Sequence, residues 1–144
     1  MASSRPRLLI PADVLNAVMG HALRELPNEC CGVLAGVCSA DGKELRVSHG
    51  YALRNVADDP RTEFLSEPRD MFEAVRAMRA GELEVLAVYH SHPTSHPVPS
   101  RTDLEMNYWP GVVTIIISLT ESPPLVRAWW LGESDYREAK LDLE

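Results

Sequence analysis

The order of hydrophobic and polar positions predicts a chain in which strands outnumber helices. Apolar residues at helical spacing predict helices over residues 11–26, from 68 to near 81, and from 100 onward. Nearly continuous or β-branched apolar runs predict buried strands over residues 31–37, 45–54, 84–89, 112–119 and 125–131. The weaker alternation over residues 136–143 predicts one last edge strand, and residues 62–65 a short extended piece.

Two turn signals and one helix start fix how these elements connect. Asp41-Gly42 predicts a hairpin between the first two strands, and Glu121-Ser122-Pro123-Pro124 predicts another between the last two long ones. Ser66 or Glu67 is expected to cap the second helix, with Pro68 in its first turn. The mixture of strands and helices predicts an α/β (α+β) fold in which a mixed β-sheet is flanked by helices.

The length of 144 residues predicts a single domain, residues 1–144, with a sizeable core. A hydrophobic content of 45% and a charged content of 24% are those of an ordinary globular protein. The net charge is −7 and no run of Lys or Arg stands out, so we expect no nucleic-acid partner.

Cysteine usage and the N-terminal segment predict a cytoplasmic protein. Three cysteines, two of them adjacent, form a poor disulfide framework, and no C-x-x-C pair is present for a structural zinc site. The apolar run Leu8-Leu9-Ile10 is interrupted by Pro11, so neither a signal peptide nor a membrane span is expected. The oligomeric state is left open.

The segment His90-Ser91-His92-Pro93 carries the strongest chemical signal. Because side chains alternate along a strand, His90 and His92 are expected to point to the same side at the end of the apolar strand 84–89. With Asp103 they offer three ligands for one zinc ion, and a fourth, open position is what makes a zinc site catalytic. Histidines at the end of a strand are equally compatible with ordinary hydrogen-bonded residues.

Two further candidates also have simpler explanations. Ser100 and Asp103 fit a capping box at a helix start, which alone would explain both residues. Glu29 precedes the apolar strand and would act as a general base if it lay over a metal, but an acidic residue at a loop end is usually solvated. His96 is expected to be a solvated loop residue, and Ser91 to point to the opposite face of the strand.

Together these residues resemble the JAMM, or MPN-plus, zinc metalloproteases. That family shows a Glu, then His-Ser/Thr-His-Pro, then Ser-x-x-Asp, with ten residues between the second His and the Asp. Here residues 93–102 give that spacing, and the segment Pro27–Gly36 is similar to the family's Glu-x-Cys-Gly-x-Leu-x-Gly. The resemblance covers most of the chain and is greatest to the small prokaryotic members, which include enzymes that trim or deconjugate sulfur-carrier and other ubiquitin-like proteins.

The resemblance implies a JAB/MPN fold, similar to that of cytidine deaminases, and one zinc ion. It implies that His90, His92 and Asp103 are the metal ligands, that Glu29 is the general acid/base acting on metal-activated water, and that Ser100 steadies the tetrahedral intermediate. The implied substrate is the C-terminal tail of a ubiquitin-like or sulfur-carrier protein. Residues 64–67 and the loop 93–99 are the expected groove for that tail.

Other functions are less consistent with the residues. A non-catalytic MPN-type interaction scaffold is the alternative, although such proteins usually lack the ligands that this chain retains. A DNA-repair branch with a similar motif carries a DNA-binding module and a basic face, which are not found here. A zinc nucleoside deaminase would need a Pro-Cys-x-x-Cys ligand pair, which the sequence does not contain.

Overall fold

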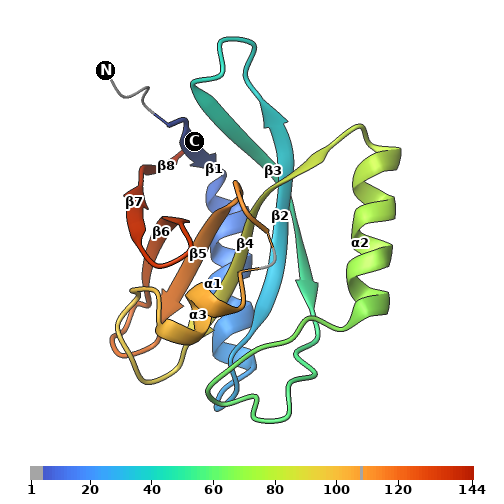
Figure 1. Ribbon diagram of the computed structural model, residues 1–144. Helices are drawn as coiled ribbons and strands as arrows, with labels where there is room; N and C mark the ends of the chain where they lie inside the picture. Colours follow the sequence, from blue (N-terminus) through green and yellow to red (C-terminus); the bar gives the residue numbers. More distant parts are fainter. Residues whose placement is uncertain (1–4, 108) are drawn as a thin grey trace.

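A computed structural model describes residues 5–107 and 109–144, and these form one eight-stranded sheet with three helices (Figure 1). Residues 1–4 of the expected single domain lie outside the described residues. The helices are α1 (Ala12–Arg24), α2 (Pro68–Ala80) and α3 (Arg101–Glu105). The strands are β1 (Arg7–Ile10), β2 (Cys31–Cys38), β3 (Glu44–Leu53), β4 (Glu84–His92), β5 (Val113–Ser118), β6 (Leu125–Leu131), β7 (Tyr136–Ala139) and β8 (Leu141–Leu143).

The sheet is mixed, as expected, with the strand order β7-β6-β5-β4-β2-β3-β1-β8. Strand β4 lies near its centre, antiparallel to β2 and parallel to β5. The register places His90 beside Cys31 of β2, and His92 beside Ser118 of β5. The carboxyl end of β4 is therefore supported by a strand on each side, which fixes where its last residues point.

The two longer helices pack on different faces of the sheet (Figure 1). Val18 and Ala22 of α1 join the larger core cluster with buried residues of β1, β2, β4, β5 and β6. Ala74 and Met78 of α2 join a smaller cluster with the opposite side of β2. Burying apolar surface on both sides makes the central strands continuously apolar, which is why the sequence shows runs there instead of alternation.

The tail differs from the single edge strand that the sequence predicts. It forms two short strands, β7 and β8, that are separated only by Lys140. Strand β7 pairs with β6, whereas β8 pairs in parallel with β1, so the tail supplies both edges of a strongly curved sheet. Very short edge strands leave little backbone open to pairing with another chain.

Strand β1 has no counterpart among the predicted elements. Leu8 and Ile10 are completely buried, and β1 inserts between β3 and β8 in parallel with both. The expected extended piece at residues 62–65 forms none of the named strands, and the residue after it, Ser66, makes an isolated bridge with Asn55. None of the helices in the described part of the chain is both long and apolar enough to pass through a membrane.

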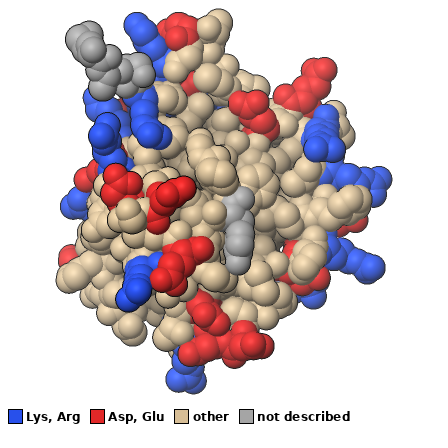
Figure 2. Space-filling view, viewed as in Figure 1, with Lys and Arg blue, Asp and Glu red and all other residues tan. Residues whose placement is uncertain are grey.

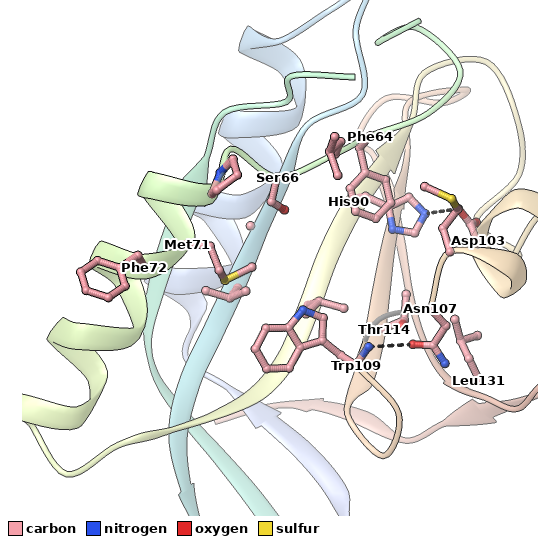
Figure 3. A pocket seen from close by; sticks show the side chains of 16 residues that line it. Phe64, Ser66, Met71, Phe72, His90, Asp103, Asn107, Trp109, Thr114 and Leu131 are labelled. Carbon is pink, nitrogen blue, oxygen red and sulfur yellow. Dashed lines mark hydrogen bonds and ion pairs between the residues drawn. The ribbon is translucent and has the colours of Figure 1, made fainter. Parts of the chain in front are cut away.

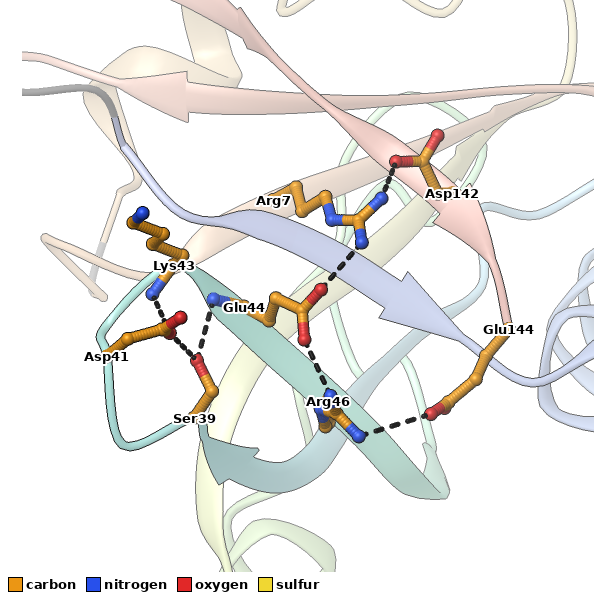
Figure 4. Close-up of polar contacts among 8 residues, drawn as sticks. All are labelled: Arg7, Ser39, Asp41, Lys43, Glu44, Arg46, Asp142 and Glu144. Atoms are coloured by element: carbon orange, nitrogen blue, oxygen red, sulfur yellow. Dashed lines mark hydrogen bonds and ion pairs between the residues drawn. The ribbon is translucent and has the colours of Figure 1, made fainter.

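Ion pairs join β1 to the strands on either side of it (Figure 4). Arg7 lies between Glu44 at 2.6 Å and Asp142 at 3.1 Å, which links β1 to β3 and β8. Arg46 extends the row from Glu44 at 2.7 Å to Glu144 at 4.0 Å. Exposed pairs of this kind contribute about 0–1 kcal/mol each to stability. The row therefore helps to align β1, β3 and β8 more than it stabilises the fold.

Candidate metal centre and active site

Three side chains meet where β4 ends and α3 begins. One ligand atom from each of His90, His92 and Asp103 lies within 4.8 Å of the other two, a grouping that could hold a metal ion. His90 Nε2 lies 3.1 Å from Asp103 Oδ1, and His92 Nε2 lies 3.1 Å from Asp103 Oδ2. All three side chains are buried. The expectation that both histidines project to one side of the strand is therefore confirmed.

The short helix α3 aims the carboxylate of Asp103. Ser100 caps the helix, because its Oγ accepts the Asp103 backbone N–H at 3.0 Å while its own N–H donates to Asp103 Oδ2 at 2.9 Å. The capping box predicted as the simpler explanation is thus confirmed, and it coexists with the approach of Asp103 to the histidines. Burial alone would raise the pKa of Asp103, but the close approach of His90 and the hydrogen bonds with His92 and the Ser100 amide hold it well below its ordinary value.

Each histidine is oriented by a different neighbour. His92 Nδ1 lies 2.8 Å from the backbone carbonyl of His96, so the ring donates there and turns Nε2 toward Asp103. The His90 ring is stacked on Phe64, with centroids 4.6 Å apart and an interplanar angle of 22°. The His96 side chain is exposed, as predicted, and it is the carbonyl of this residue that contributes to the site.

Glu29 lies two residues before β2 with only 6% of its surface exposed, so the solvated alternative is wrong. Its backbone is fixed by a bond from Glu29 N–H to the Pro60 carbonyl at 2.7 Å and from the Asn55 side-chain amide to the Glu29 carbonyl at 3.0 Å. Burial raises the pKa of Glu29 to about 8, the charge of His92 opposes the shift, and the charges of Asp103 and Glu63 add to it.

Buried polar atoms without partners mark this site among the described residues. They are Oε1 of Glu29 and both ring nitrogens of His90, since the contact from His90 Nε2 to Asp103 is close without the geometry of a hydrogen bond. Buried donors and acceptors are almost always paired in native proteins. Two imidazoles, one carboxylate and an unpaired acid beside them fit a metal ion with an exchangeable position.

A cavity of about 490 Å³ opens beside these residues (Figure 3). Its walls come from α2 and from the segment after α3, with Met71 and Phe72 on one side and Trp109 on the other. His90 and Asp103 form its polar end, and most of the remaining lining is apolar. In Figure 2, most charged side chains on this face lie away from the largely uncharged area between α2 and α3. The cavity suits an extended, uncharged segment that reaches the polar end.

Two remaining sequence expectations can be placed. Ser91 points away from the side chains of its neighbours His90 and His92, as predicted, and its hydroxyl accepts the Cys30 backbone N–H at 2.8 Å. Sequence reasoning missed Asn55, whose side-chain amide also donates to the Glu63 carbonyl at 3.0 Å and whose oxygen accepts the Leu65 N–H at 3.0 Å. Asn55 thereby orders the loop that carries Phe64, and no local sequence pattern predicts that role.

Comparison with known proteins defines the class of this fold and site. The family described as prokaryotic homologs of the JAB domain matches residues 11–132, and the chain belongs to this family. It is similar over 100% of both chains to a desampylase of Haloferax volcanii, at 34% identity. It is 32% identical to the CysO-cysteine peptidase of Mycobacterium tuberculosis, over 77% of this chain and 73% of the relative. A solution structure from Desulfitobacterium hafniense superposes with a TM-score of 0.85 at 29% identity, over 95% of this chain and 92% of that one.

Proposed function

We propose that this protein is a zinc-dependent peptidase or isopeptidase that hydrolyses the amide bond at the C-terminal tail of a ubiquitin-like or sulfur-carrier protein. The observation that carries the proposal is the grouping of His90, His92 and Asp103 beside the buried, unpaired carboxyl of Glu29. The names of the similar proteins, a desampylase and a CysO-cysteine peptidase, support this class of substrate. A cytoplasmic location stays part of the proposal.

The donor set favours one zinc ion over a hard cation. Two imidazole nitrogens and one carboxylate oxygen are the ligands of catalytic zinc sites, whereas magnesium and calcium prefer oxygen alone. When bound, zinc supplies a Lewis acid that polarises a carbonyl and makes water a stronger nucleophile at neutral pH.

Glu29 would transfer the proton, and Ser100 would stabilise the developing negative charge. Oε1 of Glu29 is free to accept the proton of the attacking water and to return it to the leaving amine. A pKa raised by burial suits this role, because the acid then holds the proton between the two steps. The Ser100 hydroxyl accepts the Asp103 amide, so its own hydrogen is left to donate to the oxyanion.

The tail of the substrate would bind along residues 64–66. Within the described residues, the amides and carbonyls of Phe64 and Ser66 make no hydrogen bond, while the intervening Leu65 carbonyl pairs with Val56 at 2.8 Å. This alternation leaves one edge of a short ribbon open beside the 490 Å³ cavity. An extended peptide can add to such an edge through main-chain bonds and place alternate side chains in the cavity.

A panel of linear fusions tests the proposal. Each ubiquitin-like or sulfur-carrier protein of the source genome is fused through its Gly-Gly tail to a reporter, and a matched fusion ends in Ala-Ala. Zinc-loaded protein is expected to release the reporter after Gly-Gly, to spare the Ala-Ala control, and to stop when a chelator removes the metal. Stoichiometric zinc with no cleavage of any fusion would contradict the proposal and favour a non-catalytic MPN-type scaffold that keeps a metal site.

A further inference from the structure

Three consecutive carbonyls of the loop 93–99 are each bonded by a side chain from the sheet below. The Ser95 carbonyl accepts the Ser118 hydroxyl at 2.6 Å, the His96 carbonyl accepts His92 Nδ1 at 2.8 Å, and the Pro97 carbonyl accepts the Trp129 indole N–H at 2.8 Å. The His96 contact in the middle orients a proposed metal ligand. The two flanking contacts come from residues outside that ligand set.

The sheet brings these donors together. Ser118 is the neighbour of His92 in the β4–β5 register, so the loop that leaves β4 at His92 folds back directly over it. Trp129 pairs with Thr114, which lines the same cavity as His90, and therefore projects from the same face of the sheet as the histidines. Ser118 is fully buried and Trp129 is 7% exposed, so water does not readily replace either donor.

The loop has few other means of fixing its shape. Three of its residues are prolines, which have no backbone N–H to donate, and the Val98 N–H bonds only within the loop, to the His96 carbonyl at 2.8 Å. Side-chain donors must therefore fix its position over the sheet. Without the Trp129 bond, the Pro97 carbonyl would be buried and unpaired, and the loop would shift to find a partner.

We propose that Trp129 is a positioning residue for the metal site, which acts through the Pro97 carbonyl to hold the His96 carbonyl against His92. Trp129 does not touch the ligand atoms; it determines the place of the carbonyl that orients the ring of His92. The ring of Trp129 is itself held edge-on by Tyr136, with centroids 5.3 Å apart. This role rests on the proposed function for its link to zinc, but the contacts themselves are between protein atoms alone.

Two single variants separate this role from general packing. Trp129→Phe keeps an aromatic ring at this position and removes the indole donor together with part of the ring. Trp130→Phe is the matched control, because it loses the same part of a ring at a similarly buried neighbouring position of β6, in the core cluster that also contains residues of α1. Ser118→Ala, measured in parallel, removes the neighbouring donor without a change in ring packing.

The metal-free protein is measured first, by the exchange rate of the His92 Nδ1 proton in NMR spectra. Trp129→Phe is expected to speed this exchange while Trp130→Phe leaves it unchanged, and Ser118→Ala should act in the same direction as Trp129→Phe. Zinc affinity is then measured by competition with a chelating dye, and Trp129→Phe is expected to weaken it about tenfold, at the lower end of the effect of contacts that orient metal ligands.

Equal exchange rates and equal zinc affinities in Trp129→Phe and Trp130→Phe would overturn the inference, whatever their thermal stabilities. Absence of zinc binding in the wild-type protein would instead refute the proposed function. In that case the exchange rate of His92 would still decide whether Trp129 positions the loop.

Discussion

A buried histidine lies on each side of the central strand β4, and the two rings differ in their hydrogen bonding. On the α1 side, His21 is 6% exposed, and its Nδ1 lies 2.7 Å from the hydroxyl of Tyr89. On the α2 side, His90 is 1% exposed, and neither of its ring nitrogens has a hydrogen-bond partner among the described residues. Tyr89 and His90 are neighbours in sequence, so one strand supplies both environments.

The paired polar group, His21, stabilises the fold, whereas the unpaired nitrogens of His90 are available to a ligand. Burial lowers the pKa of His21, which keeps the ring neutral and lets it pair with a hydroxyl in the core. Gly32 makes this pair possible, because a Cβ at that position would collide with the Tyr89 ring. Around His90 the unpaired atoms are a cost to the metal-free fold that a bound metal ion removes.

The largest expected effect is the difference in zinc binding between two variants, His90→Ala and His21→Ala. His90→Ala should abolish zinc binding and cleavage. It should destabilise the metal-free protein only through the packing lost against Phe64, because the removed nitrogens are unpaired. His21→Ala should keep one zinc per chain and its activity, and lower the free energy of unfolding by about 2 kcal/mol through lost packing and an unpaired Tyr89 hydroxyl. Metal analysis and urea unfolding of both variants measure the contrast.

The comparison would fail if His21→Ala lost zinc while His90→Ala retained it. Equal zinc content in both variants would show that His90 is an ordinary core histidine, as the sequence alone allowed.

A smaller effect is expected from the pH dependence of Glu29. Its ordinary pKa is 4.5 and its folded pKa is about 8, so the folded metal-free protein binds this proton more tightly than the unfolded chain. The free energy of unfolding should therefore fall as the pH rises from about 4.5 to about 8. Glu29→Gln has no carboxyl to ionise and should be more stable than the wild type by about 2 kcal/mol near pH 8. This value is smaller than the free energy that the whole pKa shift would give, because water reaches part of the site.

Unfolding curves for both proteins at intervals between pH 5 and pH 9 measure this difference. A constant offset between wild type and Glu29→Gln over that range would show that the carboxyl titrates normally and is not confined by burial.

The smallest effect is expected on the structural side of the strand. Tyr89→Phe removes the hydroxyl that pairs with His21 and should lower the free energy of unfolding by about 1 kcal/mol, because a buried nitrogen loses its partner. Zinc content and turnover should equal those of the wild type. A loss of zinc in this variant would show that the two faces of β4 are coupled.

Most of the elements and the meeting of His90, His92 and Asp103 were predictable because their signals are local. Periodicity marks the strand that ends at His90 and His92, and the capping pattern places Asp103 in a first helical turn. The burial of Glu29 was not predictable, because it depends on residues 55–63 folding back over the start of β2. A loop-end acid looks the same in sequence whether solvent or another loop covers it.

Contacts that depend on distant pairing were missed for the same reason. Phe64 stacks on His90 from a loop that Asn55 orders, and Trp129 bonds the loop 93–99 from β6. Both contacts depend on segments that meet only in the folded chain, which no local pattern encodes. The division of the tail at Lys140 and the insertion of β1 between β3 and β8 are likewise consequences of how the sheet curves.

The most direct test of the account compares the turnover of zinc-loaded wild type and Glu29→Gln on a Gly-Gly-linked ubiquitin-like fusion, with zinc content measured on the same samples. We expect one zinc per chain in both proteins and turnover in Glu29→Gln that is about 10²- to 10⁴-fold slower, the usual cost of losing a general acid/base. Equal turnover by the two zinc-loaded proteins would contradict it, because the buried, unpaired carboxyl of Glu29 would then have no part in the reaction.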